Sequence, residues 1–442
     1  MASSRTVDRL SVTFDDDHAV ADAGLLLPAT LAEQLGLRDL FEARVDLGDV
    51  PGRANVGDKA MTLVATLIAG GECIDDADAL RAGETDQVLR HRVVAPSTLG
   101  TFLRAFSFGH ARQLDMTAAE LLRRAWSSGA GVGHEPLTVD LDSTICETYG
   151  LNKEGGSRFT YTHVRGYHPL LAIAAGTGDV LHCRLRGGPS HAGRGAASFV
   201  TESVNRARAA GAQREIIVRA DSGFYNHKVV NACTRRDVRF SITVRLTPAL
   251  HKAIAAIDGG AWTPIPYFQD GAAVAETTYT PFATRKDARP VRLIVRRVPP
   301  SPGSQLALFT EHSYHAFVTD RDGDMLTLEA DHRRHAEVEN TIRDLKHSLG
   351  LNHMPSGRFG ANAAWLAFNA IAHNLMRWVT RIGLGEKLVM TKTIRRRYLS
   401  LPGRITRSAR RVWLHLPRKW PWRERFLAAL ARLQAIPPPL IA

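Results

Sequence analysis

The order of apolar segments between residues 137 and 244 constrains the fold most, because strand-like runs and helical patterns alternate there. Short apolar or alternating runs bounded by turn residues indicate strands, and apolar residues three or four positions apart indicate helices. The predicted elements are, in order, the strands Leu137–Leu141, Pro169–Ala175 and Val180–Leu185, the helix Ala196–Ala210, the strand Ile216–Ala220, the helix His227–Arg236 and the strand Val238–Val244. This order predicts an α/β fold in which helices flank a mixed sheet.

Other regions flank and interrupt this core. Residues 1–133 read as mostly helical and end in a Gly-rich stretch, and 247–311 read as a β-rich insertion of short alternating runs. After the insertion we expect the strand His315–Thr319, the helices Leu326–Ser348 and Ala361–Ile382, and then basic helical pieces broken by prolines. The predicted division of the chain is 1–133, 134–246, 247–311, 312–382 and 383–442.

A short helix is also predicted at Pro96–Phe106, with Ser97 as its N-terminal cap. A short helix after a turn is compatible with DNA recognition. Its apolar face, formed by Leu99, Phe102 and Phe106, is equally compatible with a core helix.

Positive charge is concentrated at the C-terminal end. The 442 residues carry a net charge of +13, and the segment from Arg381 to the end holds fifteen Lys or Arg against two Asp or Glu. A basic segment on a nearly neutral body predicts binding of nucleic acid, with a solubilising or membrane-surface tail as the alternative. Within it the predicted contacts to DNA are Arg395, Arg396, Arg397, Arg410 and Arg411.

The cysteines and the apolar runs exclude several classes of protein. The four cysteines are scattered and form no CxxC pair, which argues against a zinc site and a disulfide framework. The first ten residues contain no apolar signal core, and the longest apolar run is too short to span a bilayer. We therefore expect a cytoplasmic protein, associated with the nucleoid, without a membrane partner.

Three acidic residues stand where chemistry is favoured. Asp142 ends a strand, on the same face as Asp140, because side chains alternate along a strand. Asp221 ends the apolar strand before a Ser-Gly turn, and Glu339 lies on a predicted helix. Taken singly, each has a plainer explanation, namely a turn cap or a surface ion pair. The prediction depends on the ordered set within an α/β frame.

The three carboxylates suit metal-dependent phosphodiester chemistry. Mg²⁺ prefers carboxylate oxygens, and two such ions can activate the attacking oxygen and stabilise the leaving oxygen. Arg343 and Lys346 lie one and two helical turns beyond Glu339, where they can hold a DNA phosphate.

These motifs resemble the DDE transposases of bacterial insertion sequences, and in detail insertion-sequence family thirteen-eighty of DDE group one. The matching segments are Asp-Ser-Thr at Asp142, Arg-Ala-Asp-Ser-Gly-Phe-Tyr around Asp221, and Glu-Asn-Thr-Ile-Arg-Asp-Leu-Lys from Glu339. The resemblance runs from about residue 137 to about 374. It implies a ribonuclease H-like core, with the three acids as the catalytic and metal-binding triad for Mg²⁺, which Mn²⁺ can replace. Asp221 and Glu339 are 118 positions apart, and the predicted insertion fills that gap.

The helix motif of the family carries Tyr, Arg, Glu and Lys at fixed spacing. Here Glu339 and Lys346 match, whereas His332 and His335 occupy the Tyr and Arg positions. The basic residues next to them, Arg333 and Arg334, can supply the charge for a phosphate. Glu337 is the local rival of Glu339, but its spacing to the lysine is wrong.

In related enzymes the insertion shapes the cut end, in some of them through an aromatic residue that holds a flipped base. Trp262 is the tryptophan of the insertion, so it is either that aromatic residue or part of the β-domain core.

The resemblance implies a transposase that binds the terminal inverted repeats of an insertion sequence, cuts them and joins them to target DNA. Its partner is double-stranded DNA, and it is expected to act as a homodimer on DNA. The alternatives are a related metal-dependent nuclease that does not rejoin DNA and an inactive or domesticated DNA-binding protein.

Overall fold

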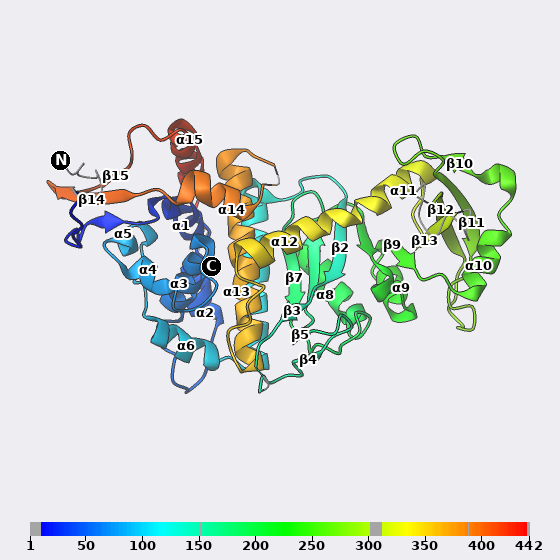
Figure 1. Cartoon of the computed structure of the whole chain (residues 1–442), viewed down its shortest axis with the longest axis horizontal. Coiled ribbons are helices and arrows are strands. Elements are labelled where there is room, and N and C mark those ends of the chain that lie inside the picture. The colour runs from blue at the N-terminus through cyan, green and yellow to red at the C-terminus, as the bar shows by residue number, and fades with distance from the viewer. Residues whose placement is uncertain (1–9, 151, 301–311, 388, 440–442) are drawn as a thin grey trace, which may run out of the picture.

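The structure is a computed structural model that describes residues 10–150, 152–300, 312–387 and 389–439. A nine-stranded mixed sheet runs through the middle and one end of the molecule, and a mainly helical body forms the other end (Figure 1). The order of strands is β10-β11-β12-β13-β9-β8-β2-β6-β7. The core strands are β2 (Leu137–Ser143), β6 (Leu170–Ala174), β7 (Val180–Arg184), β8 (Ile216–Ala220) and β9 (Arg239–Val244).

The central strands are apolar because both faces of the sheet are covered. β8 is buried along its whole length between β2 and β9, and it runs parallel to both. Strands of this kind read as continuous apolar runs. β6 and β7 form an antiparallel hairpin beside β2. Helix α8 (Ala196–Ala210) then leads to β8, and α9 (His227–Thr234) leads on to β9. The predicted α/β order of the core is therefore confirmed.

The predicted insertion continues the same sheet past β9. Its strands pair antiparallel in sequence order, and β13 (Ser313–Thr319) connects them to β9. The other elements of this part are α10 (Pro248–Ala255), β10 (Thr263–Pro264), β11 (Ala273–Tyr279) and β12 (Val291–Val298). A small separate core that includes Val274, Ile294 and Phe317 stabilises it. The last predicted part of the insertion, 301–311, lies outside the described residues.

A nearly continuous helix crosses from the insertion to the core (Figure 1). The predicted helix Leu326–Ser348 consists of α11 (Met325–Arg333), a 3-10 turn at Arg334–Glu337, and α12 (Val338–Ser348). Helix α13 (Phe359–Trp378) follows and is buried along most of its length, so it joins the sheet to the helical body.

The N-terminal half of the helical body, as described from residue 10, contains seven α-helices. They are α1 (Leu26–Gln34), α2 (Leu37–Arg44), α3 (Val56–Ala69), α4 (Ala77–Arg81), α5 (Thr85–Leu89), α6 (Pro96–Arg104) and α7 (Phe108–Ala125). Helix α6 begins after Ala95 with proline in its first turn, and Ser97 makes no cap, contrary to the prediction. The ring of Phe102 lies 5.0 Å from that of Phe106 and 6.2 Å from that of Phe368 on α13. The apolar face of α6 therefore packs in the core.

The C-terminal region is not wholly helical, which corrects the prediction. Helices α14 (Thr391–Ile394) and α15 (Arg423–Gln434) enclose a hairpin of β14 (Gly403–Ser408) and β15 (Arg411–His415), and β1 (Ala19–Val20) pairs with β14. The prediction of helical pieces in this region depended on its basic charge and its prolines. It missed the alternation of Ile405, Val412 and Leu414 with polar residues, which favours strands.

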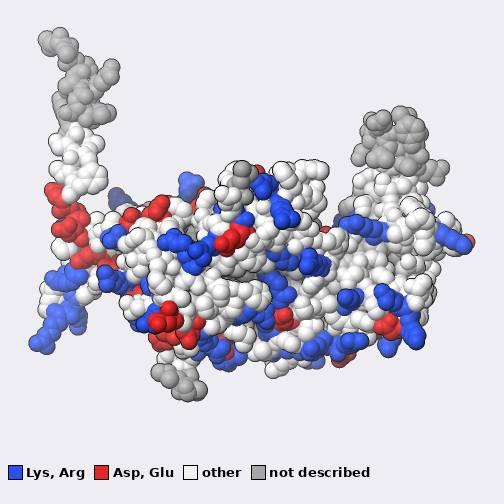
Figure 2. Space-filling view, turned by 90° about the horizontal axis from the view of Figure 1, so that it is seen from below, with Lys and Arg blue, Asp and Glu red and all other residues white. Residues whose placement is uncertain are grey.

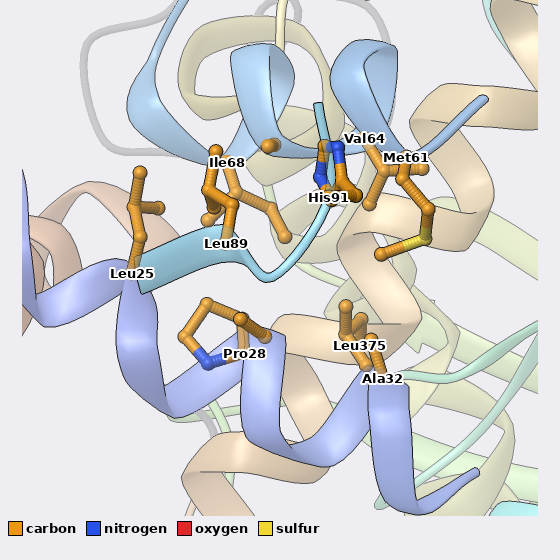
Figure 3. Close-up of a pocket in the computed structure, with 11 residues that line it drawn as sticks. Leu25, Pro28, Ala32, Met61, Val64, Ile68, Leu89, His91 and Leu375 are labelled. Carbon is orange, nitrogen blue, oxygen red and sulfur yellow. The ribbon is translucent and has the colours of Figure 1, made fainter. Parts of the chain in front are cut away.

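The helical body contains helices from both halves of the chain, since α15 packs against α1. Figure 3 shows a small cavity in this body, lined by apolar side chains of α1 and α3, by Leu375 of α13 and by His91. Burial lowers the pKa of the His91 imidazole. A cavity with a single polar group on its wall is a packing feature rather than a ligand site.

No helix among the described residues is both long and apolar enough to cross a lipid bilayer. All four cysteines, which lie in the described part of the chain, are free thiols.

Candidate active site

The register of two parallel strands places Asp142 and Asp221 side by side. β2 pairs with β8 so that Asp140 lies opposite Arg219 and Leu141 lies opposite Ala220. Asp142 and Asp221 are the next positions along, on neighbouring strands that are about 4.8 Å apart in a sheet. Asp221 caps the 3-10 turn Ser222–Phe224, where its Oδ1 accepts the Gly223 N–H at 3.0 Å.

Glu339 lies in the first turn of α12. The charges of Asp221 and Glu339 both raise the pKa of Asp142. Burial is the largest cause, and together these effects raise that pKa to about 6, against the lowering effects of the Ser143 N–H and His335. The three predicted acids are therefore electrostatic neighbours.

The three carboxylates do not yet form a closed set of metal ligands. Among the described residues, no three His, Cys, Asp or Glu side chains stand close enough together to hold one ion. The donors are nonetheless of the right kind, because carboxylate oxygens are what Mg²⁺ prefers. Asp142 is a half-buried carboxylate with two acidic neighbours. A divalent cation would offset that surplus of negative charge, so the residues fit such an ion.

A buried ion pair joins the two strands that end at Asp142 and Asp221. Arg219 donates to both oxygens of Asp140, at 2.6 and 2.9 Å, and both side chains are almost fully buried. Arg219 also binds the main-chain oxygen and the carboxylate of Asp331 at the end of α11, and Arg321 binds the same carboxylate. The pair thus connects β2, β8 and α11, which leads through the 3-10 turn into α12, the helix that carries Glu339. The sequence analysis did not predict this ion pair, although an arginine inside an otherwise apolar strand could have indicated it.

The two histidines of the helix motif are engaged within the protein. His335 donates from Nδ1 to Asp140 Oδ1 at 2.9 Å. His332 stacks on Phe317 at 4.0 Å, and its two ring nitrogens lie 2.7 Å from the Ser241 hydroxyl and 2.9 Å from the Thr243 hydroxyl. Burial holds the pKa of His332 well below its usual value. Its ring is therefore neutral and has no free nitrogen for a phosphate.

The cations predicted to bind DNA near Glu339 differ in how strongly other residues of the protein hold them. Lys346 donates to the Ile145 carbonyl at 2.7 Å, just beyond β2. Arg343 is exposed and has one hydrogen bond, to Asn340 at 3.3 Å. Arg334 pairs with Glu337, and Arg333 lies 4.5 Å from the ring centre of Phe268 in the insertion. Of these four cations, Arg343 is therefore held most weakly by other residues of the protein.

The three predicted arginines that follow α14 have separate environments. Arg395 donates to the carbonyl oxygens of Leu67, Ile68 and Ser348, and burial lowers its pKa. In this structure it therefore connects α3 to the end of α12. Arg397 lies 5.9 Å from the ring centre of Trp422, whereas Arg396 is exposed.

Arg410 and Arg411 lie at the tip of the β14–β15 hairpin. Both are exposed, and neither has an ion pair or a side-chain hydrogen bond within the described residues. Arg410 has φ of 66°, as a tight two-residue turn requires. Figure 2 shows a group of basic side chains projecting at this end of the molecule and more Lys and Arg than acids across its middle and right part.

Trp262 in the insertion lies under a cation. The guanidinium of Arg297 is 4.4 Å from its ring centre, and Tyr314 is 6.2 Å away. The indole is half-buried and packs against the core of the sheet, as the second of the two interpretations expects.

Comparison with known proteins identifies the family. A search of curated proteins finds no match. One similar solved structure is that of a piggyBac transposase synaptic complex with hairpin DNA, at 12% identity and a TM-score of 0.43, covering 85% of this chain and 79% of that chain. That TM-score is too low to support an argument. The model of the transposase DDE domain, group 1, matches residues 3–438. The chain therefore belongs to that family and is a DDE-type transposase.

Proposed function

We propose that this transposase cuts and rejoins DNA at a ribonuclease H-like core, with Asp142, Asp221 and Glu339 as its catalytic carboxylates. The observation that supports this proposal most is the register of β2 and β8, which brings Asp142 and Asp221 to neighbouring positions, together with the effect of the Glu339 charge on the pKa of Asp142. The strand order β7-β6-β2-β8-β9, with an antiparallel hairpin beside three parallel strands, supports the choice of core.

The three carboxylates would hold Mg²⁺ or Mn²⁺, which would supply charge stabilisation for the attacking and leaving oxygens. Hydrolysis at each element end would free a 3′-hydroxyl, which would then attack the target DNA. Arg343, one helical turn beyond Glu339 and exposed, would bind a phosphate of the DNA. The Asp140–Arg219 pair would hold β2 and β8, which carry the two aspartates, against α11, which precedes the helix of Glu339.

We expect cleavage of DNA that carries the sequences flanking the coding region to need a divalent metal. Activity should be present with Mg²⁺, absent with EDTA, and restored by Mg²⁺ or Mn²⁺, because the three acids repel one another without a cation. Gel assays of end cleavage measure it. Supplying cut ends together with target DNA tests the second step, because a nuclease leaves the ends unjoined. Undiminished cleavage in EDTA, or no joined product, would overturn the proposal.

The exposed hairpin tip is proposed to grip DNA, since a two-stranded β-ribbon fits a DNA groove. The R410A/R411A variant should bind the element ends more weakly and with a shallower salt dependence. The slope of log affinity against log salt should fall by about 2, one unit for each lost phosphate contact. Fluorescence anisotropy across a salt series gives the slope.

The R410K/R411K variant is the matched control, since lysine keeps the charge, and it should retain most of the slope. A slope in R410A/R411A equal to that of the wild-type protein would remove the hairpin from the DNA interface. We also propose that the protein acts as a homodimer on DNA, because two element ends are joined in one event.

A further inference from the structure

The segment 10–17, here called the acidic arm, has the sequence pattern of a strand but lies in no strand or helix among the described residues. Its apolar residues Leu10, Val12 and Phe14 alternate with polar ones, and three aspartates follow. This alternation is typical of a strand with one apolar face. The three apolar side chains are 74%, 72% and 103% exposed. Exposed apolar side chains gathered on one segment mark an interaction site.

The acidic arm runs past the end of the sheet that it leads into. It is followed by β1, which pairs antiparallel with β14 so that Ala19 lies opposite Arg404. Five positions further along both segments at this register, Phe14 would lie opposite residue 409. Strand β14 ends at Ser408, and the hairpin turns there. Within the described residues, the apolar part of the arm therefore has no strand of its own chain to pair with on this edge.

The opposite edge of that sheet is open. In the order β1-β14-β15, strand β15 pairs with β14 and with no other strand of the described part of the chain. The apolar face of the hairpin begins in the core, where Ile405 lies opposite Leu414, and continues outward to Val412, which is 58% exposed. The hairpin projects from the helical body, so this edge is accessible (Figure 1). An open edge with exposed apolar side chains is a template for a further strand from another chain.

The apolar residues of the acidic arm and of this edge have the same spacing. The edge carries Val412, Leu414 and Leu416 at every second position, as the arm carries its three apolar residues. The alignment of such apolar positions sets the register of paired strands. With Val12 opposite Leu414, all three apolar pairs lie on one face. Adding the arm would extend the apolar face of the hairpin and pair the open backbone groups of β15.

Basic residues lie at both ends of this edge, and they decide the direction of the acidic arm. In the parallel direction the aspartates come to the end of the edge beyond Leu416, where Arg418 and Lys419 are exposed at a turn. In the antiparallel direction they would instead cover Arg410 and Arg411 at the hairpin tip, which are proposed to bind DNA. The parallel direction therefore gives the acidic charge a basic partner and leaves the tip free.

We propose that the acidic arm of one copy adds as a strand, parallel to β15, to the hairpin of a second copy of this chain. Within one chain the arm lies on the β1 side of β14, so it would have to fold back around the hairpin tip to reach the same edge. A second copy presents that edge without such a turn. Two copies can exchange arms reciprocally, as a two-fold dimer requires. This inference rests on the homodimer of the proposed function and names the surface through which the copies associate.

Mixing two cysteine variants of the full-length protein tests the contact between copies. In the proposed register Leu10 lies opposite Val412, so L10C and V412C should form a disulfide-linked dimer on mild oxidation, seen on a non-reducing gel. F14C should not link to V412C, because four residues of a strand, about 13 Å, separate their positions. M116C, exposed on α7, is a second control that should not link to V412C. The wild-type protein, with its four free cysteines, gives the background.

Association of the copies should weaken when the apolar face of the acidic arm is lost. V12N/F14N should raise the dissociation constant of the dimer about a hundredfold, which is roughly tenfold for each apolar side chain that is no longer buried. Sedimentation with and without DNA carrying the element ends measures it. S11A/T13A changes the other face of the same segment and should leave the dissociation constant unchanged.

Three results would overturn the inference. They are a link of V412C to F14C instead of L10C, an L10C/V412C double variant that links only within one chain, and a dissociation constant in V12N/F14N equal to that of the wild-type protein. Each of these leaves the proposed homodimer and the proposed cleavage standing, because dimers and cleavage are measured separately. A protein that stays monomeric on the element ends would contradict the homodimer itself and, with it, this contact.

Discussion

The Asp221→Asn variant is expected to cleave element ends about 10³-fold more slowly than the wild-type protein, since losing several kcal/mol of transition-state stabilisation costs that factor. Asparagine keeps the size of the side chain and an oxygen that can still accept the Gly223 N–H. The turn should therefore form as before. What is lost is one negative charge and one strong metal ligand.

Single-turnover cleavage with saturating protein measures this loss directly. A parallel titration with Mn²⁺, followed by electron paramagnetic resonance, should show weaker binding of the ion in Asp221→Asn. Unchanged thermal unfolding would show that the fold is intact. Cleavage within tenfold of the wild-type rate would remove Asp221 from the triad.

Two glutamates on one helix provide a matched comparison for the third acid. Glu339→Gln should lose cleavage as Asp221→Asn does, because the charge of its carboxylate acts on Asp142. Glu337→Gln should remain active, since Glu337 is exposed and pairs with Arg334. The reverse result would show that Glu337 is the third member of the triad.

The Arg219→Met variant is expected to lose about 3–5 kcal/mol of the free energy of unfolding, because removing one partner leaves a buried charge uncompensated. Arg219 satisfies both oxygens of Asp140 and also binds Asp331. Methionine fills a similar volume without donating a hydrogen bond. Urea unfolding followed by circular dichroism measures the loss.

A double variant separates lost charge pairing from lost packing. Asp140→Leu combined with Arg219→Met removes both charges, and such replacements of a buried pair are often neutral. The double variant should therefore be more stable than Arg219→Met alone. Equal or lower stability would show that the pair matters through packing. Arg343→Ala, on the exposed face of α12, should leave stability nearly unchanged.

Local pattern was sufficient for the core elements. Helix α8 and strand β8 begin and end at the predicted residues, because each has its apolar face or its whole length buried and the sequence records that burial directly. Nothing in the sequence indicated the break in the predicted helix Leu326–Ser348. It occurs at Arg334–Glu337, where residues of ordinary helix propensity adopt a 3-10 turn.

Short strands and surface roles escaped prediction. The small sheet between β2 and β6 is formed by strands of two or three residues, Cys146–Glu147, Arg158–Phe159 and Arg165–Tyr167, which are too short for a period to be read. The Arg395 side chain illustrates a second limit. Sequence placed it in a basic run, but three carbonyl oxygens from distant segments occupy its guanidinium. A charged residue in the sequence does not show which groups its side chain will contact in the folded protein.

The sequence by itself determined the type and order of the core elements and the position of each acid at a strand end or on a helix, since these depend on neighbours along the chain. Only the tertiary structure decided that Leu141 lies opposite Ala220 and that Asp140 and Arg219 are buried as a pair. The physical reason is that strand register, ion-pair partners and exposure are set by contacts between segments far apart in the chain.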